Sequence, residues 1–119
     1  MNSPLLDPAQ LAEIRALSTI RPEFPEQMLE LFTESASEAL KGCLAARQTG
    51  DTRQLQSFAH RLKGTAASFG ALQLRQQAEQ LENDAILARN IKQQRLDAIE
   101  RTIAKTHEAY ADWLQQTAG

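Results

Sequence analysis

One short stretch of the chain, AHRLKGTAASFG at residues 59–70, combines residue types that could carry a transferable group. His60 is one of only two histidines in the 119 residues, and Lys63 and Gly64 follow it closely. A neutral imidazole is a nucleophile at physiological pH. A phosphoryl group attached to it would carry about two negative charges, and Lys63, about one helical turn away, could offset them as a mobile point charge. The spacing therefore suits a carrier of phosphoryl groups better than a self-contained enzyme.

Gly64 lies inside a predicted helix, where glycine costs about 1 kcal/mol relative to alanine. Such a glycine is explained where another molecule must approach the backbone closely. The neighbours of His60 on the helix surface are Gln56, Lys63, Gly64 and Ala67, three, four and seven residues away. Since Gly64 and Ala67 leave open space, we expect a docking surface that includes Gln56 and Ala67.

His60 is predicted to face away from the interior. Helix residues advance by about 100° each, and His60 lies about 150° from the middle of the apolar sector on that count. The sector consists of Leu55, Phe58, Ala59, Leu62, Ala66 and Phe69. An exposed histidine without a function is the alternative, but it leaves Gly64 unexplained.

The rest of the chain repeats apolar residues at helical spacing, with short joints between the repeats. This pattern predicts an all-α fold, an antiparallel four-helix bundle preceded by a short capping helix. The length fits a single domain over residues 1–119. The expected helices cover residues of about 7–18, 23–49, 51–69, 72–89 and 91–116.

Several residues are typical of helix ends. Asp7 is placed to cap the first helix, and Gln10 could complete a capping box with it. Asp51 is placed in the same way before the third helix, directly after Gly50, which suits a left-handed helix end. Asn90 is expected to form a similar left-handed cap between the last two helices.

Four further side chains have structural interpretations. His107 falls on the apolar stripe of the last helix, so we expect a hydrogen-bonded histidine at the bundle seam rather than a second reactive one. Tyr110 and Trp113 are expected to close one end of the bundle with the first helix. Cys43 lies on an apolar stripe, which indicates a buried, inert thiol.

Composition excludes several classes of function. The chain is 42% hydrophobic and 24% charged. Its formal net charge of −2 gives no long-range electrostatic attraction to nucleic acid or anionic membranes. A single cysteine, no apolar run of the roughly 20 residues that a span needs, and no signal-peptide pattern favour a cytoplasmic protein. A di-iron bundle would need Glu-x-x-His pairs, but Ser57 and Ala104 precede the two histidines by three residues. We therefore expect no metal site.

The segments AHRLKGTAASFGA and LRQQAEQLE together resemble the histidine-containing phosphotransfer (HPt) domain of multistep two-component phosphorelays. The resemblance extends over nearly the whole chain. It implies that Nε2 of His60 accepts a phosphoryl group from an aspartyl phosphate on a receiver domain and passes it to another receiver aspartate. Lys63 then balances charge and Gly64 provides clearance. Glu82 matches the position that accepts a hydrogen bond from the imidazole Nδ1, which would fix the tautomer.

The resemblance also implies what the partners supply. The chain contains no Gly-rich nucleotide-binding loop, so we expect a phosphoryl carrier without its own ATP site and without a cofactor. Mg²⁺ would come from the receiver domains of hybrid sensor kinases and response regulators. We expect docking to be transient and the chain to be a monomer. Arg53, Arg61 and Arg75 could lie at the rim of the docking surface. A helical adaptor that docks partners without phosphotransfer is the main alternative, and a purely structural bundle is a weaker one.

Overall fold

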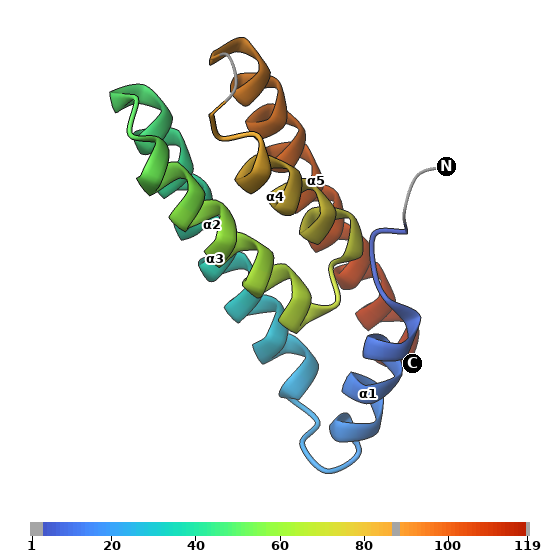
Figure 1. The fold of residues 1–119 in the computed structure, drawn as a ribbon. Coiled ribbons are helices and arrows are strands. Elements are labelled where there is room, and N and C mark those ends of the chain that lie inside the picture. Colours follow the sequence, from blue (N-terminus) through green and yellow to red (C-terminus); the bar gives the residue numbers. More distant parts are fainter. Residues whose placement is uncertain (1–3, 87–88, 119) are drawn as a thin grey trace.

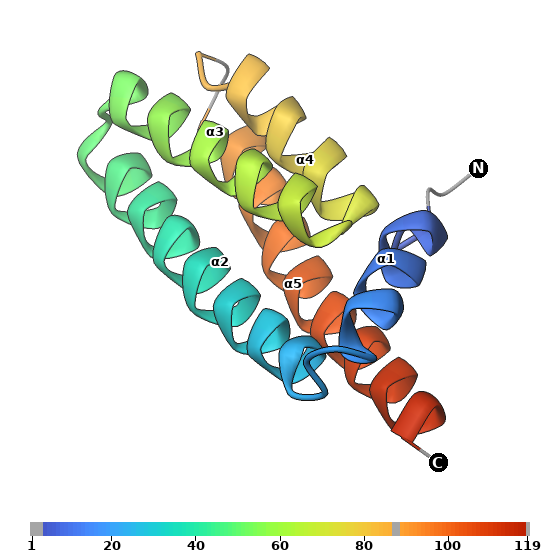
Figure 2. The same ribbon diagram turned by 90° about the horizontal axis from the view of Figure 1, so that it is seen from below.

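The computed structural model describes residues 4–86 and 89–118, and this part of the chain is all-α, as the sequence predicts. Helices α2 to α5 run antiparallel to their neighbours along the chain, and α1 lies at one end of the bundle, beside the last turns of α5 (Figures 1 and 2). The helices of the described residues are α1 (Pro8–Ser18), α2 (Phe24–Thr49), α3 (Thr52–Phe69), α4 (Leu72–Asn83) and α5 (Arg89–Ala118). None of them is long and apolar enough to cross a membrane.

Helix α3 is held between α2 and α4 by two tight joints. Gly50 ends α2 in the left-handed conformation with φ 72°, and the side chain of Asp51 accepts a hydrogen bond from the Gln54 backbone at 3.0 Å. Gly70 ends α3 in the same way with φ 79°. Because each joint reverses the chain within a few residues, α3 packs antiparallel to both α2 and α4. Its apolar residues face the core, which leaves the opposite face to solvent.

The core combines small and large apolar side chains. Fully buried alanines let neighbouring backbones approach, and leucines fill the remaining volume at interior packing density. Cys43 lies among them, and burial raises the pKa of its thiol to about 12. The prediction of a buried, inert cysteine is therefore confirmed. Core residues from the four bundle helices include Ala36, Ala39, Leu55, Ala59, Leu62, Leu74, Ala78, Leu81, Leu96 and Ile99.

Aromatic side chains close the end of the bundle near α1. Phe32 stacks on Phe69 with ring centroids 4.3 Å apart, and the Tyr110 ring is tilted against Phe69 with centroids 4.5 Å apart. The Tyr110 hydroxyl donates a hydrogen bond to the Pro25 carbonyl at 3.0 Å. Trp113 continues the cluster, and Arg15 of α1 lies over its ring at 5.4 Å. The predicted closure by Tyr110, Trp113 and the first helix is thus confirmed.

The last two helices differ from the sequence prediction at their junction. Helix α4 ends at Asn83 rather than near residue 89, because Asp84 leaves the helical conformation with φ −95° and ψ 9°. Arg95 of α5 donates to the Asp84 carboxylate through Nε at 3.2 Å, which anchors this exit. Asn90 lies inside α5 and is not a left-handed cap. Residues 87 and 88, which the predicted fourth helix over 72–89 includes, lie outside the described residues.

His107 is exposed, so the prediction of a histidine at the bundle seam is wrong. The neighbouring Thr106 is buried instead, together with Thr102 and Tyr110. Thr106 tolerates burial because its hydroxyl donates to the Thr102 carbonyl at 2.7 Å, which satisfies its polar group. An apolar-stripe count overlooks this, since threonine counts as polar in the pattern.

The segment before α1 is attached to the joint between α3 and α4. Asp7 donates its backbone N–H to the Gly70 carbonyl at 2.8 Å, and Leu72 donates to the Leu5 carbonyl at 3.0 Å. Asp7 caps α1 through its side chain, as expected. The Gln10 side chain does not complete a capping box: it donates to the Ser68 carbonyl at 3.3 Å. These contacts fix the end of α3 relative to the start of α4.

Candidate functional site

His60 projects from the solvent face of α3, and 68% of its side-chain surface is exposed. The core-facing side of the same helix holds Leu55, Ala59, Leu62 and Ala66, all fully or almost fully buried. This agrees with the orientation predicted from helical periodicity. The imidazole is therefore accessible to a large partner without any movement of the bundle.

Glu82 of α4 contacts the imidazole from the neighbouring helix. Its Oε2 lies 3.0 Å from Nδ1 of His60, which is the contact expected from the sequence. A carboxylate can only accept, so Nδ1 carries the proton and donates it. The second nitrogen, Nε2, then keeps its lone pair, which is the form of imidazole that acts as a nucleophile.

Lys63 also binds Glu82, one turn along α3 from His60. Its ammonium nitrogen lies 2.9 Å from Oε1, so the two carboxylate oxygens serve two different side chains. This ion pair with Lys63, together with the hydrogen bond from His60, holds the pKa of Glu82 below its usual value. The carboxylate is consequently ionised at neutral pH and remains an acceptor for the Nδ1 proton.

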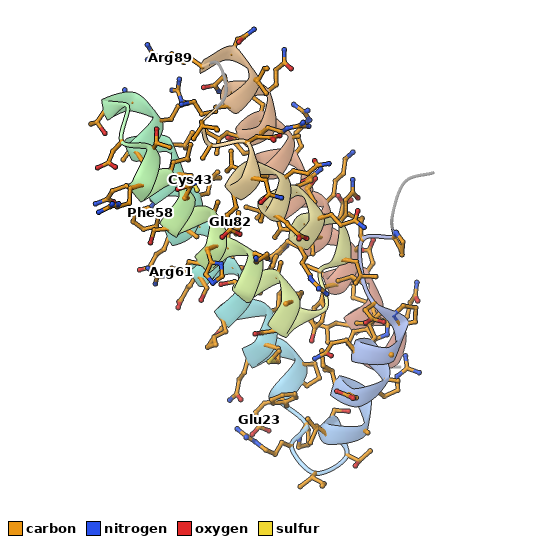
Figure 3. The ribbon with its side chains drawn as sticks, viewed as in Figure 1. Glu23, Cys43, Phe58, Arg61, Glu82 and Arg89 are labelled. Atoms are coloured by element: carbon orange, nitrogen blue, oxygen red, sulfur yellow. The ribbon has the colours of Figure 1, made fainter. Side chains whose placement is uncertain are left out.

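The antiparallel pairing of α3 and α4 brings these three side chains together. His60 and Lys63 are three residues apart and lie on one face of α3, and Glu82 lies in the last turn of α4, beside the middle of α3. Figure 3 labels Glu82 at this place, between the two helix ribbons. The pairing of Lys63 with Glu82 was not predicted, because Lys63 was expected only to balance the charge of a phosphoryl group on His60.

A surface hollow opens next to the imidazole, with a volume of about 350 Å³. A Cβ atom added to Gly64 would meet nothing within 4 Å, so the packing of the chain does not require a glycine there. Gln56, expected in the docking surface, is exposed but does not line the hollow. The lining residues are His60, Lys63, Gly64, Ala67, Arg75 and Glu79.

The three arginines expected around the site have different surroundings. Arg61 points to α2, where its guanidinium lies 3.3 Å from Glu38 (Figure 3 labels Arg61). Arg53 is exposed near the start of α3 and does not line the hollow. Arg75 lines it, together with Glu79, for which no role was predicted. A count along α4 could have found Glu79, because it lies one turn before Glu82.

Comparison with known proteins bears directly on this geometry. A family model described as the Hpt domain matches residues 27–118. The chain belongs to the Hpt domain family. The matched residues begin in the first turn of α2 and extend through α5, so α1 lies outside the match. A search of curated proteins found no match.

Two solved structures share this Hpt fold. The crystal structure of histidine-containing phosphotransfer protein B (HptB) from Pseudomonas aeruginosa PAO1 is 28% identical, with a TM-score of 0.80. That alignment covers 97% of this chain and 98% of HptB. A putative histidine-containing phosphotransfer protein from rice is 18% identical with a TM-score of 0.81, over 97% of this chain and 86% of the rice chain. The rice likeness shows the fold alone.

Proposed function

We propose that this Hpt domain carries a phosphoryl group between receiver domains of a two-component phosphorelay, with His60 as the acceptor. Membership of the Hpt domain family supports the phosphotransfer role. The observation that supports His60 is its contact with Glu82: an exposed imidazole has its Nδ1 proton bound at 3.0 Å, which leaves Nε2 free and facing solvent. His107 has no comparable partner among the interactions of the described residues.

The transfer step follows from the protonation of the ring. The Nε2 lone pair attacks the phosphorus of an aspartyl phosphate, the N–P bond forms, and the bond from phosphorus to the aspartyl oxygen breaks. The receiver carboxylate leaves with that electron pair. Nδ1 keeps its proton, so the ring becomes cationic, and the Glu82 carboxylate at 3.0 Å stabilises the new positive charge.

The second transfer reverses these changes on another receiver. A carboxylate oxygen of the second aspartate attacks phosphorus, the N–P bond breaks, and its electron pair returns to Nε2. The ring is again neutral, with its Nδ1 proton still bound to Glu82. Because no proton leaves the imidazole in either direction, the chain needs no general base, and Glu82 serves to position the ring.

The open setting of His60 fits partners that bring the remaining chemistry. We propose that receiver domains of hybrid sensor kinases and response regulators dock over the hollow and supply Mg²⁺ with their own acidic residues. The chain would act as a carrier without an ATP site, as a monomer in the cytoplasm. An interface around a single exposed side chain and its hollow would fall in the small, transient class.

Labelling from a phosphorylated receiver tests this function. We expect the wild-type chain to acquire an acid-labile, base-stable label and the His60→Gln variant to acquire none. His107→Gln is the matched control, because it removes the other exposed histidine, and it should label like the wild type. Label on the His60→Gln variant, or its loss in His107→Gln, would show that His60 is not the acceptor.

A further inference from the structure

We propose that Arg75 is a phosphoryl-binding residue, whose guanidinium contacts the phosphoryl group on His60 and stabilises the phosphorylated form of the chain. The inference rests on the proposed function of His60 and adds a group that the phosphotransfer step itself does not use. Arg75 lies on α4, and His60 lies on α3. Both line the same hollow, with the small residues Gly64 and Ala67 leaving the space beside them open.

The charges around the hollow explain why a further cation is needed. In the unphosphorylated chain, Lys63 is balanced by Glu82 at 2.9 Å, and Arg75 and Glu79 carry opposite charges. The four charged side chains therefore sum to zero. A phosphoryl group brings about two negative charges, of which the cationic ring offsets one, and the charge of Lys63 is already balanced by Glu82. Glu79 adds repulsion, so the phosphorylated hollow requires a cation that is not already committed.

Arg75 is that cation. Among the described residues, no ion pair or hydrogen bond of its guanidinium is found, whereas Arg61 is bound to Glu38 and Arg95 to Asp84. Its side chain is exposed and therefore able to reorient. A guanidinium is planar, stays charged at all relevant pH values, and can bind two phosphate oxygens at once. It is thus better suited than an ammonium to hold the group in one orientation.

The place of Arg75 within α4 is also unusual for an arginine with no other role. It lies in the first turn of the helix, which contains no acidic residue. The positive end of the helix dipole lies there, and a cation at this end is unfavourable. A phosphoryl group at the hollow would relieve this repulsion, because it would place negative charge against the guanidinium.

The test measures the equilibrium of phosphoryl exchange between the chain and one receiver. When little of either protein is in the complex, the affinity of docking does not affect this equilibrium constant. The effect of a substitution on the constant then reports the stability of the phosphohistidine. We compare wild type, Arg75→Ala, Arg75→Gln and Arg75→Lys. Arg61→Ala is the matched control: it removes the same charge from α3 beside His60 but outside the hollow. Circular dichroism verifies that every variant is folded.

We expect Arg75→Ala and Arg75→Gln to shift the equilibrium away from His60 by about two- to fivefold, the range for an exposed ion pair. The shift should shrink as salt is raised, Arg75→Lys should retain part of the wild-type value, and Arg61→Ala should retain all of it. The ³¹P resonance of the isolated phosphoprotein, prepared with phosphoramidate, should move in Arg75→Ala but not in Arg61→Ala.

An unchanged equilibrium with a slower approach to it would show that Arg75 serves docking of the receiver, which overturns the proposal. Equal shifts in Arg75→Ala and Arg61→Ala would overturn it too, since they would reflect net charge alone. If wild type accepts no phosphoryl group from receivers or phosphoramidate, the proposed function itself fails. That result differs from a failure of the Arg75 proposal alone, because it is seen with the wild-type chain itself.

Discussion

Two glycines inside long helices of this chain have opposite surroundings. A Cβ atom on Gly42 of α2 would collide with the ring of Phe58, which packs directly on the glycine backbone. A Cβ atom on Gly64 of α3 would meet open space. Packing therefore explains Gly42, whereas nothing within the chain explains the cost of a glycine at position 64. The space that Gly64 leaves is available to a partner beside His60.

Substitution of Gly64 should separate stability from transfer. We expect Gly64→Ala to raise the free energy of unfolding by about 1 kcal/mol, because alanine is the better helix former and meets no clash. Gly64→Gln should fold as well but slow transfer from a receiver by about tenfold, since overpacking a close contact costs about 1–3 kcal/mol. Urea unfolding and labelling rates measure the two effects. Wild-type transfer rates in Gly64→Gln would refute the clearance role.

The depressed pKa of Glu82 predicts how stability depends on pH. The Lys63 ion pair is the largest cause of the depression, and the hydrogen bond from His60 adds to it. The contribution of Glu82 to stability is therefore present above its unfolded pKa of about 4.5 and is lost as pH falls through the lower folded value.

Comparison of the wild type with Glu82→Gln isolates this contribution. The difference in unfolding free energy between the two proteins should be constant near neutral pH and should narrow as the pH falls below about 4.5. Urea unfolding at a series of pH values measures it, with Glu38→Gln as a control for an exposed carboxylate of α2. A difference that widens on acidification would contradict the assigned direction of the pKa.

The sequence predicted much of the site at this scale. Helical counting gave the outward direction of His60, and the family resemblance supplied Glu82 as the partner of Nδ1. The ion pair of Lys63 with Glu82 was missed, because spacing along one helix says nothing about what the next helix offers. Arg75 was expected at the rim of the docking surface and lines the hollow, whereas Glu79 was missed although it lies one turn before Glu82 on α4.

At the scale of elements, the joint between α3 and α4 sets the register of the site. The segment before α1 pairs with this joint through the Asp7–Gly70 and Leu72–Leu5 backbone hydrogen bonds. Gly70 has φ 79°, and a Cβ atom there would lie 2.7 Å from Gln10. Position 70 therefore favours glycine for two reasons, the positive φ of its backbone and the close approach of Gln10 from α1.

Gly70→Ala should destabilise the chain more than Gly50→Ala, which serves as its matched control. Both positions have positive φ, so each alanine costs about 1–2 kcal/mol in the left-handed conformation. Only position 70 adds a collision, because nothing lies within 4 Å of a Cβ atom at Gly50. We expect an extra loss of about 1–3 kcal/mol, the usual cost of overpacking, in urea unfolding. Equal losses of unfolding free energy in the two variants would show that the Gln10 side chain moves aside without destabilising the chain.

The elements themselves were predictable where local signals were strong. Gly50, Asp51 and Gly70 fixed three helix ends, since each has a side chain or backbone preference that acts locally. The end of α4 was not predictable, because good helix formers, alanine and leucine among them, follow Asp84 in the sequence. It depends on Asp84, whose carboxylate is bound by Arg95 from the next helix. The exposure of His107 was not predictable either, because its neighbour Thr106 is buried in its place.

At the scale of the whole molecule, the packed core and the exposed candidate site occupy different parts of the bundle. The core and the aromatic end cluster fix α3 and α4, which pack side by side (Figure 1), and the exposed imidazole of His60 lies on the outer surface of α3. Amphipathic periodicity was sufficient to predict this architecture, because four apolar stripes of similar length have few other ways to be buried. The identity of the receivers depends on surface complementarity, which periodicity does not encode.

A complete relay between two receivers tests the central claim most directly. One receiver carries a labelled aspartyl phosphate, and the second carries none, with the chain present in catalytic amounts. We predict that label appears on the second receiver with the wild-type chain and does not appear with His60→Gln, although the variant keeps its helical fold. Equal transfer with both chains, or none with wild type across a panel of receivers, would contradict a carrier that acts through His60.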